Sequence, residues 1–279
     1  MSIAGGIGKA VERAEQAGCT ALQIFTKSSN QWRARVLPDE EIARFRSRLS
    51  GSGIGAVMAH DSYLINLASP GAELWERSVS SFVDEIRRCH ALGVPTLVFH
   101  PGAHVGSGEE AGMARIAKAL NRAHAETSGC EVVTALETHA GQGTTIGHRF
   151  EHLARILGEL RYPERAAVCL DTCHVFAAGY PIHTDEGWDR TLEDFDGTVG
   201  LGRLRCVHVN DSRKGLGCHV DRHEGLGQGK MGLVPFFRLV TDERTRHLPL
   251  VLETPKDDTL AADVRNLAFL RRLAEGRHP

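Results

Sequence analysis

Six histidine or acidic residues each follow a short apolar run of the sequence. They are His60, His100, Glu137, Asp171, His208 and Glu253. Imidazole and carboxylate groups both bind divalent metal ions. A lone residue of this kind after a strand is most often structural, but six in one chain argue against coincidence. The pattern therefore indicates a metal-dependent site.

Two short segments add three more donors to this set. Segment 171–174 (DTCH) places His174 within one turn of Asp171, and segment 221–223 (DRH) contributes Asp221 and His223 from a predicted loop. All nine candidates offer oxygen or imidazole nitrogen, which fits catalytic zinc, with manganese or iron as competitors. With bridging carboxylates, nine ligands can hold two or three ions, an arrangement suited to in-line displacement at phosphorus. The sequence thus predicts hydrolysis of a phosphodiester.

The charge of the chain is compatible with a polyanionic substrate only if positive charge is local. The formal net charge is -2 and the isoelectric point about 6.7. Three divalent ions among the four ligand carboxylates would leave the site positive by about two charges. Further phosphate contacts are expected from basic residues after the predicted strands, namely Lys27, Arg33, Arg35, Arg213, Lys214 and Lys230.

The elements that must position these residues alternate between strand and helix. Apolar, β-branched runs predict strands at 22–25, 55–59, 96–99, 131–136, 167–170, 206–209 and 248–252. Amphipathic stretches such as 74–92 and 111–127 predict helices between them. This rhythm predicts an α/β fold, a TIM-type (β/α)8 barrel with one catalytic domain over residues 1–279. Such barrels build their sites at the carboxyl ends of the strands, where six of the ligands stand.

The start of the chain departs from a complete barrel. It opens on Gly5-Gly6 and a helix-like segment at 7–17, with no strand before it. We therefore expect a barrel that lacks its first strand, through truncation or a misplaced start codon, because a missing strand exposes unpaired edges.

Composition places the protein in a reducing, aqueous compartment. The seven cysteines are odd in number and show no Cys-x-x-Cys spacing, so we expect free thiols. The N-terminus has no signal-peptide pattern, and no apolar run approaches the roughly 20 residues that span a bilayer. We expect a soluble cytoplasmic protein with no membrane partner.

Several long motifs make the sequence recognisable. They are 60–67 (HDSYLINL), 99–102 (FHPG), 140–143 (AGQG), 171–180 (DTCHVFAAGY), 208–211 (HVND) and 221–223 (DRH). Together they resemble endonuclease IV, the zinc-dependent apurinic/apyrimidinic endonuclease family, from about Ala4 to beyond Glu253. The resemblance implies DNA repair by cleavage 5′ to abasic sites in duplex DNA, leaving a 3′-hydroxyl and a 5′-deoxyribose phosphate. Duplexes with blocked 3′ ends are a second implied substrate, and the protein is expected to be a monomer.

The resemblance also implies a ligand assignment for three zinc ions, with manganese or iron possible at one site. His60, His100 and Glu137 would hold the first ion. Glu137 would bridge to a second ion that is held also by Asp171, His208 and Glu253. The third would be held by His174, Asp221 and His223. A metal-bridged hydroxide would attack the phosphorus, with Glu137 as the residue that orients or deprotonates that water.

DNA contacts are expected from six residues on the loops around the site. They are Lys27, Asn30, Trp32, Tyr63, Arg213 and Arg222. Some relatives place an arginine wedge where Asn30 stands. After Glu137 the family commonly has asparagine, whereas this chain has Thr138 and His139, and Gln228 stands where an acidic residue is common.

Two other functions remain open from the residues alone. A metal-dependent sugar isomerase or epimerase on the same barrel also sets histidine and carboxylate ligands at strand ends, but it does not require the set His174, Asp221 and His223. A protein that binds abasic DNA without cutting it is the other, if the missing strand has disabled the site.

Overall fold

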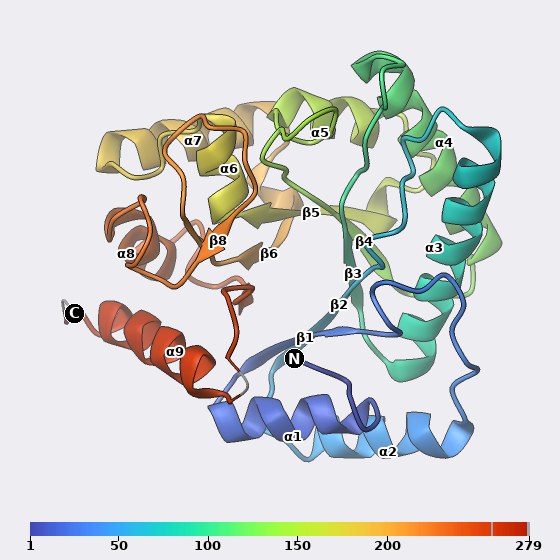
Figure 1. Ribbon diagram of the computed structural model, residues 1–279, viewed down its shortest axis with the longest axis horizontal. Coiled ribbons are helices and arrows are strands. Elements are labelled where there is room, and N and C mark those ends of the chain that lie inside the picture. Colours follow the sequence, from blue (N-terminus) through green and yellow to red (C-terminus); the bar gives the residue numbers. More distant parts are fainter. Residues whose placement is uncertain (258, 278–279) are drawn as a thin grey trace. The chain divides into compact units, whose positions relative to one another are not determined.

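Parallel strands alternate with helices along the whole of the computed structural model, which describes residues 1–257 and 259–277 (Figure 1). The contacts gather into two compact units, one formed by residues 1–137 and 155–167, the other by residues 138–154 and the chain from 168 onward. We call them unit 1 and unit 2. The division crosses the chain at three positions: directly after strand β4 (Val133–Glu137), within helix α5 (Phe150–Gly158) and within strand β5 (Ala166–Asp171).

Unit 1 carries four parallel strands in the order of the sequence. These are β1 (Ala21–Phe25), β2 (Ala56–His60), β3 (Thr96–Phe99) and β4 (Val133–Glu137). The register pairs Phe25 with His60 and Phe99 with Leu136, so the carboxyl ends of neighbouring strands lie at one edge. His60 and Glu137 are the last residues of their strands, and His100 directly follows β3.

The helices of unit 1 are amphipathic and bury one face. They are α1 (Gly8–Ala17), α2 (Asp39–Ser50), α3 (Ala72–Leu92) and α4 (Glu109–Glu126); the short η1 (Pro163–Arg165) has no buried residue. In α3 the buried residues Val79, Phe82 and Ile86 recur at helical spacing, and the ring of Phe82 packs edge-on against Phe99 of β3 at 4.9 Å. The helix ends at Gly93, whose φ of 72° is the left-handed conformation that favours glycine.

Unit 2 carries β5 (Ala166–Asp171), β6 (Leu204–His208) and β9 (Leu250–Val251), again parallel and in this order. The register pairs Asp171 with His208 and His208 with Val251, which aligns the carboxyl ends of these strands too. The other elements are α6 (Thr172–Ala178), α7 (Asp185–Thr198), η2 (Leu201–Arg203), α8 (Val234–Thr241) and α9 (Ala261–Ala274). A two-stranded antiparallel pair, β7 (Asp211–Ser212) with β8 (His223–Glu224), follows β6.

All seven predicted strands are confirmed within two residues at each end, and so are the predicted helices at 7–17, 74–92 and 111–127. The pair β7 and β8 was not predicted, because two-residue strands are too short for a period-two pattern. Whether the two units behave as the single domain that the sequence suggests stays a prediction. None of the helices in residues 1–257 and 259–277 combines the length and apolar character that a membrane span requires.

Candidate metal centre

The first ligand group, His60, His100 and Glu137, lies at the strand ends of unit 1. The Nε2 atoms of His60 and His100 lie 3.1 and 3.4 Å from Oε2 of Glu137. His60 and Glu137 are buried, whereas the side chain of His100 is 28% exposed. One donor atom from each residue lies within 4.8 Å of the other two, so this group can hold one ion.

The second ligand group, Asp171, His208 and Glu253, lies at the strand ends of unit 2. Nδ1 of His208 is 3.3 Å from Oε2 of Glu253 and 4.0 Å from Oδ2 of Asp171. Asp171 and His208 are fully buried, and the side chain of Glu253 is partly exposed. Their donor atoms also lie within 4.8 Å of one another.

The third ligand group, His174, Asp221 and His223, joins the first turn of α6 to the loop before β8. Asp221 lies between the two imidazoles, with Oδ2 at 3.2 Å from Nε2 of His174 and Oδ1 at 3.3 Å from Nε2 of His223. The two Nε2 atoms are 3.5 Å apart. Oδ2 of Asp171 is 3.8 Å from Nε2 of His223, so this carboxylate stands next to both groups of unit 2.

The neighbours of Asp221 in the third ligand group favour its charged form. Burial alone would raise the pKa of Asp221, but the hydrogen bond from His174 and the charges of His174 and His223 hold this pKa well below its usual range. Cys173 also lies close to Asp221 and His223. Burial raises the pKa of its thiol to about 12, with the charge of Asp171 adding to the effect, so Cys173 stays protonated. The carboxylate is therefore the anionic ligand here.

The ring nitrogens show whether these residues fit a metal ion. In His60, His174 and His223 the Nδ1 atom lies 2.9, 2.8 and 3.2 Å from a backbone carbonyl oxygen. A carbonyl oxygen only accepts, so Nδ1 carries a proton, whereas Nε2 holds either a second proton or a lone pair. Each Nε2 faces a carboxylate oxygen, so a cation, either that second proton or a metal ion, belongs between the two atoms. Histidines that donate their second N-H to a carbonyl are usual at metal sites, and the donor set therefore fits divalent ions.

Comparison with known proteins agrees with this geometry. A family model described as a xylose isomerase-like TIM barrel matches residues 11–273. A probable endonuclease 4 from Chloroflexus aurantiacus is 50% identical, with the alignment covering 99% of this chain and 97% of that protein. One from Geobacter sulfurreducens is also 50% identical, covering 99% and 94%. The chain belongs to the endonuclease IV family.

Solved structures support the same family and the barrel fold. The crystal structure of endonuclease IV from Thermus thermophilus matches with a TM-score of 0.88 and 38% identity, covering 99% of this chain and 97% of that one. The predicted TIM-type barrel is thus confirmed. A D-tagatose 3-epimerase-like protein matches with a TM-score of 0.76 at 14% identity, which shows a shared fold only.

The roles of two buried polar residues around the candidate ligands were not predicted from the sequence, although Thr138 was noted there as a departure from the family. Asn210 donates from Nδ2 to Oδ2 of Asp171 at 2.6 Å and accepts at Oδ1 from the backbone N-H of Glu253 at 2.9 Å. The hydroxyl of Thr138 accepts from the backbone N-H of Asp171 at 2.9 Å, and its carbonyl accepts from His174. These residues set the directions of three ligands. Their only signal in the sequence is a polar residue one or two positions after a strand-end ligand.

The residues of unit 1 that are expected to contact DNA differ in exposure. Tyr63 is 55% exposed, and its ring stacks over His100 at 6.1 Å. Asn30 is exposed, and Trp32 is partly exposed under the guanidinium of Arg77 at 4.4 Å. Lys27 is only 5% exposed.

The side chain of Lys27 points into unit 1. Its Nζ donates to the hydroxyl of Ser81 at 2.8 Å and lies 3.5 Å from Glu85 and 3.6 Å from Asp84. An ammonium group held by three side chains of α3 is not presented to a phosphate. This placement does not support the expected DNA contact of Lys27, and the proposed DNA surface rests on the other five residues.

The two expected DNA contacts of unit 2 lie on the connection between β7 and β8. Arg213 and Arg222 are both exposed there. Nε of Arg213 lies 2.8 Å from Oε2 of Glu224, while the backbone N-H of Arg213 donates to the carbonyl of Arg222 at 3.0 Å. Because Arg222 directly follows Asp221, this connection carries basic side chains beside the third ligand group.

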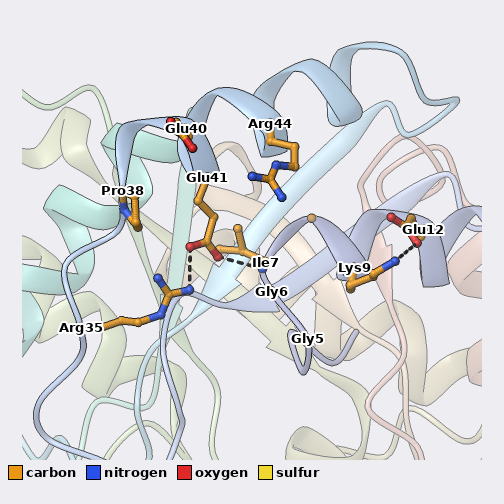
Figure 2. A pocket seen from close by; sticks show the side chains of 11 residues that line it. Gly5, Gly6, Ile7, Lys9, Glu12, Arg35, Pro38, Glu40, Glu41 and Arg44 are labelled. Carbon is orange, nitrogen blue, oxygen red and sulfur yellow. Dashed lines mark hydrogen bonds and ion pairs between the residues drawn. The ribbon is translucent and has the colours of Figure 1, made fainter.

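A hollow of about 470 Å³ in unit 1 is lined by the start of α1 and by α2, and none of the nine ligands lines it (Figure 2). Three acidic and three basic side chains line it, and four of these six are paired within the wall. Arg35 donates to the carboxylate of Glu41 at 2.6 Å, and Glu41 also accepts from the backbone N-H of Ile7 at 3.3 Å. Lys9 pairs with Glu12 at 2.8 Å. The hollow therefore offers no net charge to an anionic substrate.

Proposed function

We propose that this chain is a DNA-repair endonuclease that hydrolyses the phosphodiester 5′ to an abasic nucleotide in duplex DNA, leaving a 3′-hydroxyl and a 5′-deoxyribose phosphate. The observation that carries the proposal is the third ligand group, in which His174, Asp221 and His223 stand 3.2 to 3.5 Å apart in pairs. A sugar isomerase or epimerase with one or two ions has no use for it. Membership of the endonuclease IV family supports the same choice.

We propose that the three ligand groups hold three zinc ions, with manganese or iron as an alternative at one site. When bound, such ions supply positive charge to the phosphoryl oxygens and lower the pKa of water. Glu137 is proposed to serve two groups. It belongs to the first ligand group and is joined by a peptide bond to Thr138, whose hydroxyl and carbonyl accept hydrogen bonds from Asp171 and His174.

Four residues have a proposed part in the reaction or in binding the DNA. Glu137 is fully buried, so its carboxylate is shielded from bulk solvent. There it can orient the single attacking water or take its proton at Oε2. The exposed ring of Tyr63 is placed beside His100 to pack in the gap left by the missing base. Arg213 and Arg222 contact backbone phosphates and position the duplex without reading its sequence.

Incision of a duplex oligonucleotide with one abasic-site analogue tests the proposal, with an undamaged duplex as control. Cutting only 5′ to the lesion is expected, lost after prolonged chelation and restored by zinc, with about three zinc ions per chain. A second duplex with a blocked 3′ end tests the wider substrate range, and size-exclusion chromatography tests the expected monomer. Binding without cutting would indicate the DNA-binding alternative. Turnover of a ketose without incision would indicate the sugar enzyme.

A further inference from the structure

The imidazole of His139 lies nearly flat against that of His174. The ring centroids are 5.2 Å apart and the planes differ by 14°. His139 is only 8% exposed, and both residues belong to unit 2. His139 is not one of the nine candidate ligands, so the arrangement has no part in the function proposed above.

The hydrogen bond of the His174 ring acts mainly within the ring plane. Its Nδ1 donates to the carbonyl of Thr138 at 2.8 Å, which aims Nε2 at Asp221 and His223. A hydrogen bond at Nδ1 sets the direction of a ring but only weakly opposes rocking about the line through its two nitrogens. A lone pair lies in the ring plane, so rocking turns it away from an ion held at that point. A flat neighbour on the ring face prevents this motion.

The position of His139 is itself fixed. Its backbone N-H donates to the carbonyl of Gly147 at 3.0 Å, while the preceding backbone N-H, that of Thr138, donates to the carbonyl of Cys169 in β5 at 2.9 Å. The next residue, Ala140, is fully buried. The segment therefore holds His174 in two directions, with the carbonyl of Thr138 in the ring plane and the ring of His139 on its face.

We propose that His139 is a positioning residue for the third ligand group, and that its stacked ring sets the plane in which Nε2 of His174 meets the metal ion. The inference rests on the proposed function, since the ion is one of the three zinc ions. It also assigns a role to a residue that departs from the sequence commonly found after the glutamate in this family.

The experiment measures zinc affinity rather than activity. Full-length protein loaded with zinc is titrated with a competing chelator of known affinity, and the zinc remaining per chain is measured. His139→Ala is expected to weaken one of the zinc sites by about 10- to 100-fold, the usual effect of removing a residue that orients a ligand. His139→Phe keeps a flat ring and is expected to retain zinc as the wild type does. His174→Ala provides the reference for complete loss of the site.

A matched control separates positioning from general stability. His124 is a fully buried histidine on α4 whose ring bonds to Thr134, outside all three ligand groups. His124→Ala should lower the melting temperature but leave every zinc affinity unchanged. If His139→Ala fails to fold by circular dichroism, His139→Leu takes its place, because leucine fills the slot without a flat ring.

Two results would overturn the inference. One is a folded His139→Ala or His139→Leu variant with wild-type zinc affinity at every site. The other is a folded His139→Phe variant that loses zinc as readily as the alanine variant, since the ring plane would then not be what matters. A wild-type protein that binds no zinc or cuts no abasic DNA would instead contradict the proposed function, so the two failures are distinguishable.

Discussion

The Nε2 atom of His60 lies 3.1 Å from Oε2 of Glu137, and both side chains are buried. Nδ1 of His60 bonds to a carbonyl oxygen, so Nε2 is the ring nitrogen that faces the carboxylate. The two side chains are therefore placed to share one ion, and the proposed role of Glu137 in the reaction can be tested directly.

Glu137→Gln is expected to reduce incision of abasic DNA by about 10²- to 10⁴-fold, the range for loss of a positioned acid or base. The amide keeps the shape of the side chain but loses its charge. Single-turnover incision rates with zinc in excess provide the measurement. Glu131→Gln, at an exposed glutamate just before β4, is the control and should cut normally. Near-normal cutting by the Glu137→Gln variant would show that this carboxylate has no part in the reaction.

His223→Ala should remove one zinc ion per chain and reduce incision by about 10²-fold or more, because the third ligand group loses one of its three side chains. Zinc content and incision are measured on the same preparation. His247→Ala changes an exposed histidine of unit 2 and should affect neither quantity. Full activity with two zinc ions would favour an enzyme that needs only two.

Asn210→Ala is expected to weaken zinc binding by about 10- to 100-fold, although Asn210 is not one of the nine candidate ligands. It removes the 2.6 Å hydrogen bond to Asp171 and the 2.9 Å hydrogen bond from the backbone of Glu253. Chelator competition measures the change. Asn121→Ala, which removes hydrogen bonds to Glu159 and Arg161 in unit 1, should leave zinc binding intact.

Arg222→Ala should raise the KM for abasic DNA with little change in kcat, because an exposed arginine on the β7–β8 connection can contact a phosphate. The slope of log affinity against log salt concentration should fall by about one. Zinc content is checked in parallel, since Asp221 is adjacent. Arg246→Ala, at an exposed arginine outside this connection, should leave the slope unchanged. An unchanged slope in Arg222→Ala would place the duplex elsewhere.

His124 should make the stability of unit 1 sensitive to acid. Burial, with the charge of Arg165 adding to it, lowers the pKa of His124 from 6.5 to about 4. The folded state thus holds a neutral ring that the unfolded chain protonates below about pH 6.5, so this stability is complete above pH 6.5 and is lost as the pH falls toward 4. The loss amounts to about 3 kcal/mol.

Urea unfolding of metal-free wild type and His124→Gln at pH 7 and pH 4 measures this effect. Glutamine can keep the contact with Thr134 without titrating. The free energy of unfolding of the wild type should fall by about 3 kcal/mol more than that of the variant between the two pH values. Parallel pH profiles would show that folding does not shift the pKa of this ring.

The strands, and the nine candidate ligands at or near their ends, could be predicted from the sequence because each depends on local pattern, while metal binding by these nine residues stays a prediction. A short apolar run specifies a strand, and the fold places its carboxyl end at the site. The partners of Lys27 could not be predicted this way, since Ser81 and Glu85 lie more than 50 residues further along the chain. The roles of Asn210 and His139 were not predicted for a related reason. Their roles depend on which ligand they face, and this is known only once the strands are placed side by side.

The two carboxylate oxygens of Asp171 have different roles. Oδ1 accepts from the backbone N-H of His174 and so begins α6, while Oδ2 faces Asn210 and the ligands of unit 2. Serine and threonine begin helices well but carry no charge, whereas glutamate binds metals but is not a preferred residue at a helix start. Few replacements satisfy both demands, so natural variation should be narrower at this position than at its neighbours. At the start of α6, the two carboxylate oxygens of Asp171 are therefore constrained together, one by the helix that it begins and the other by the candidate metal site.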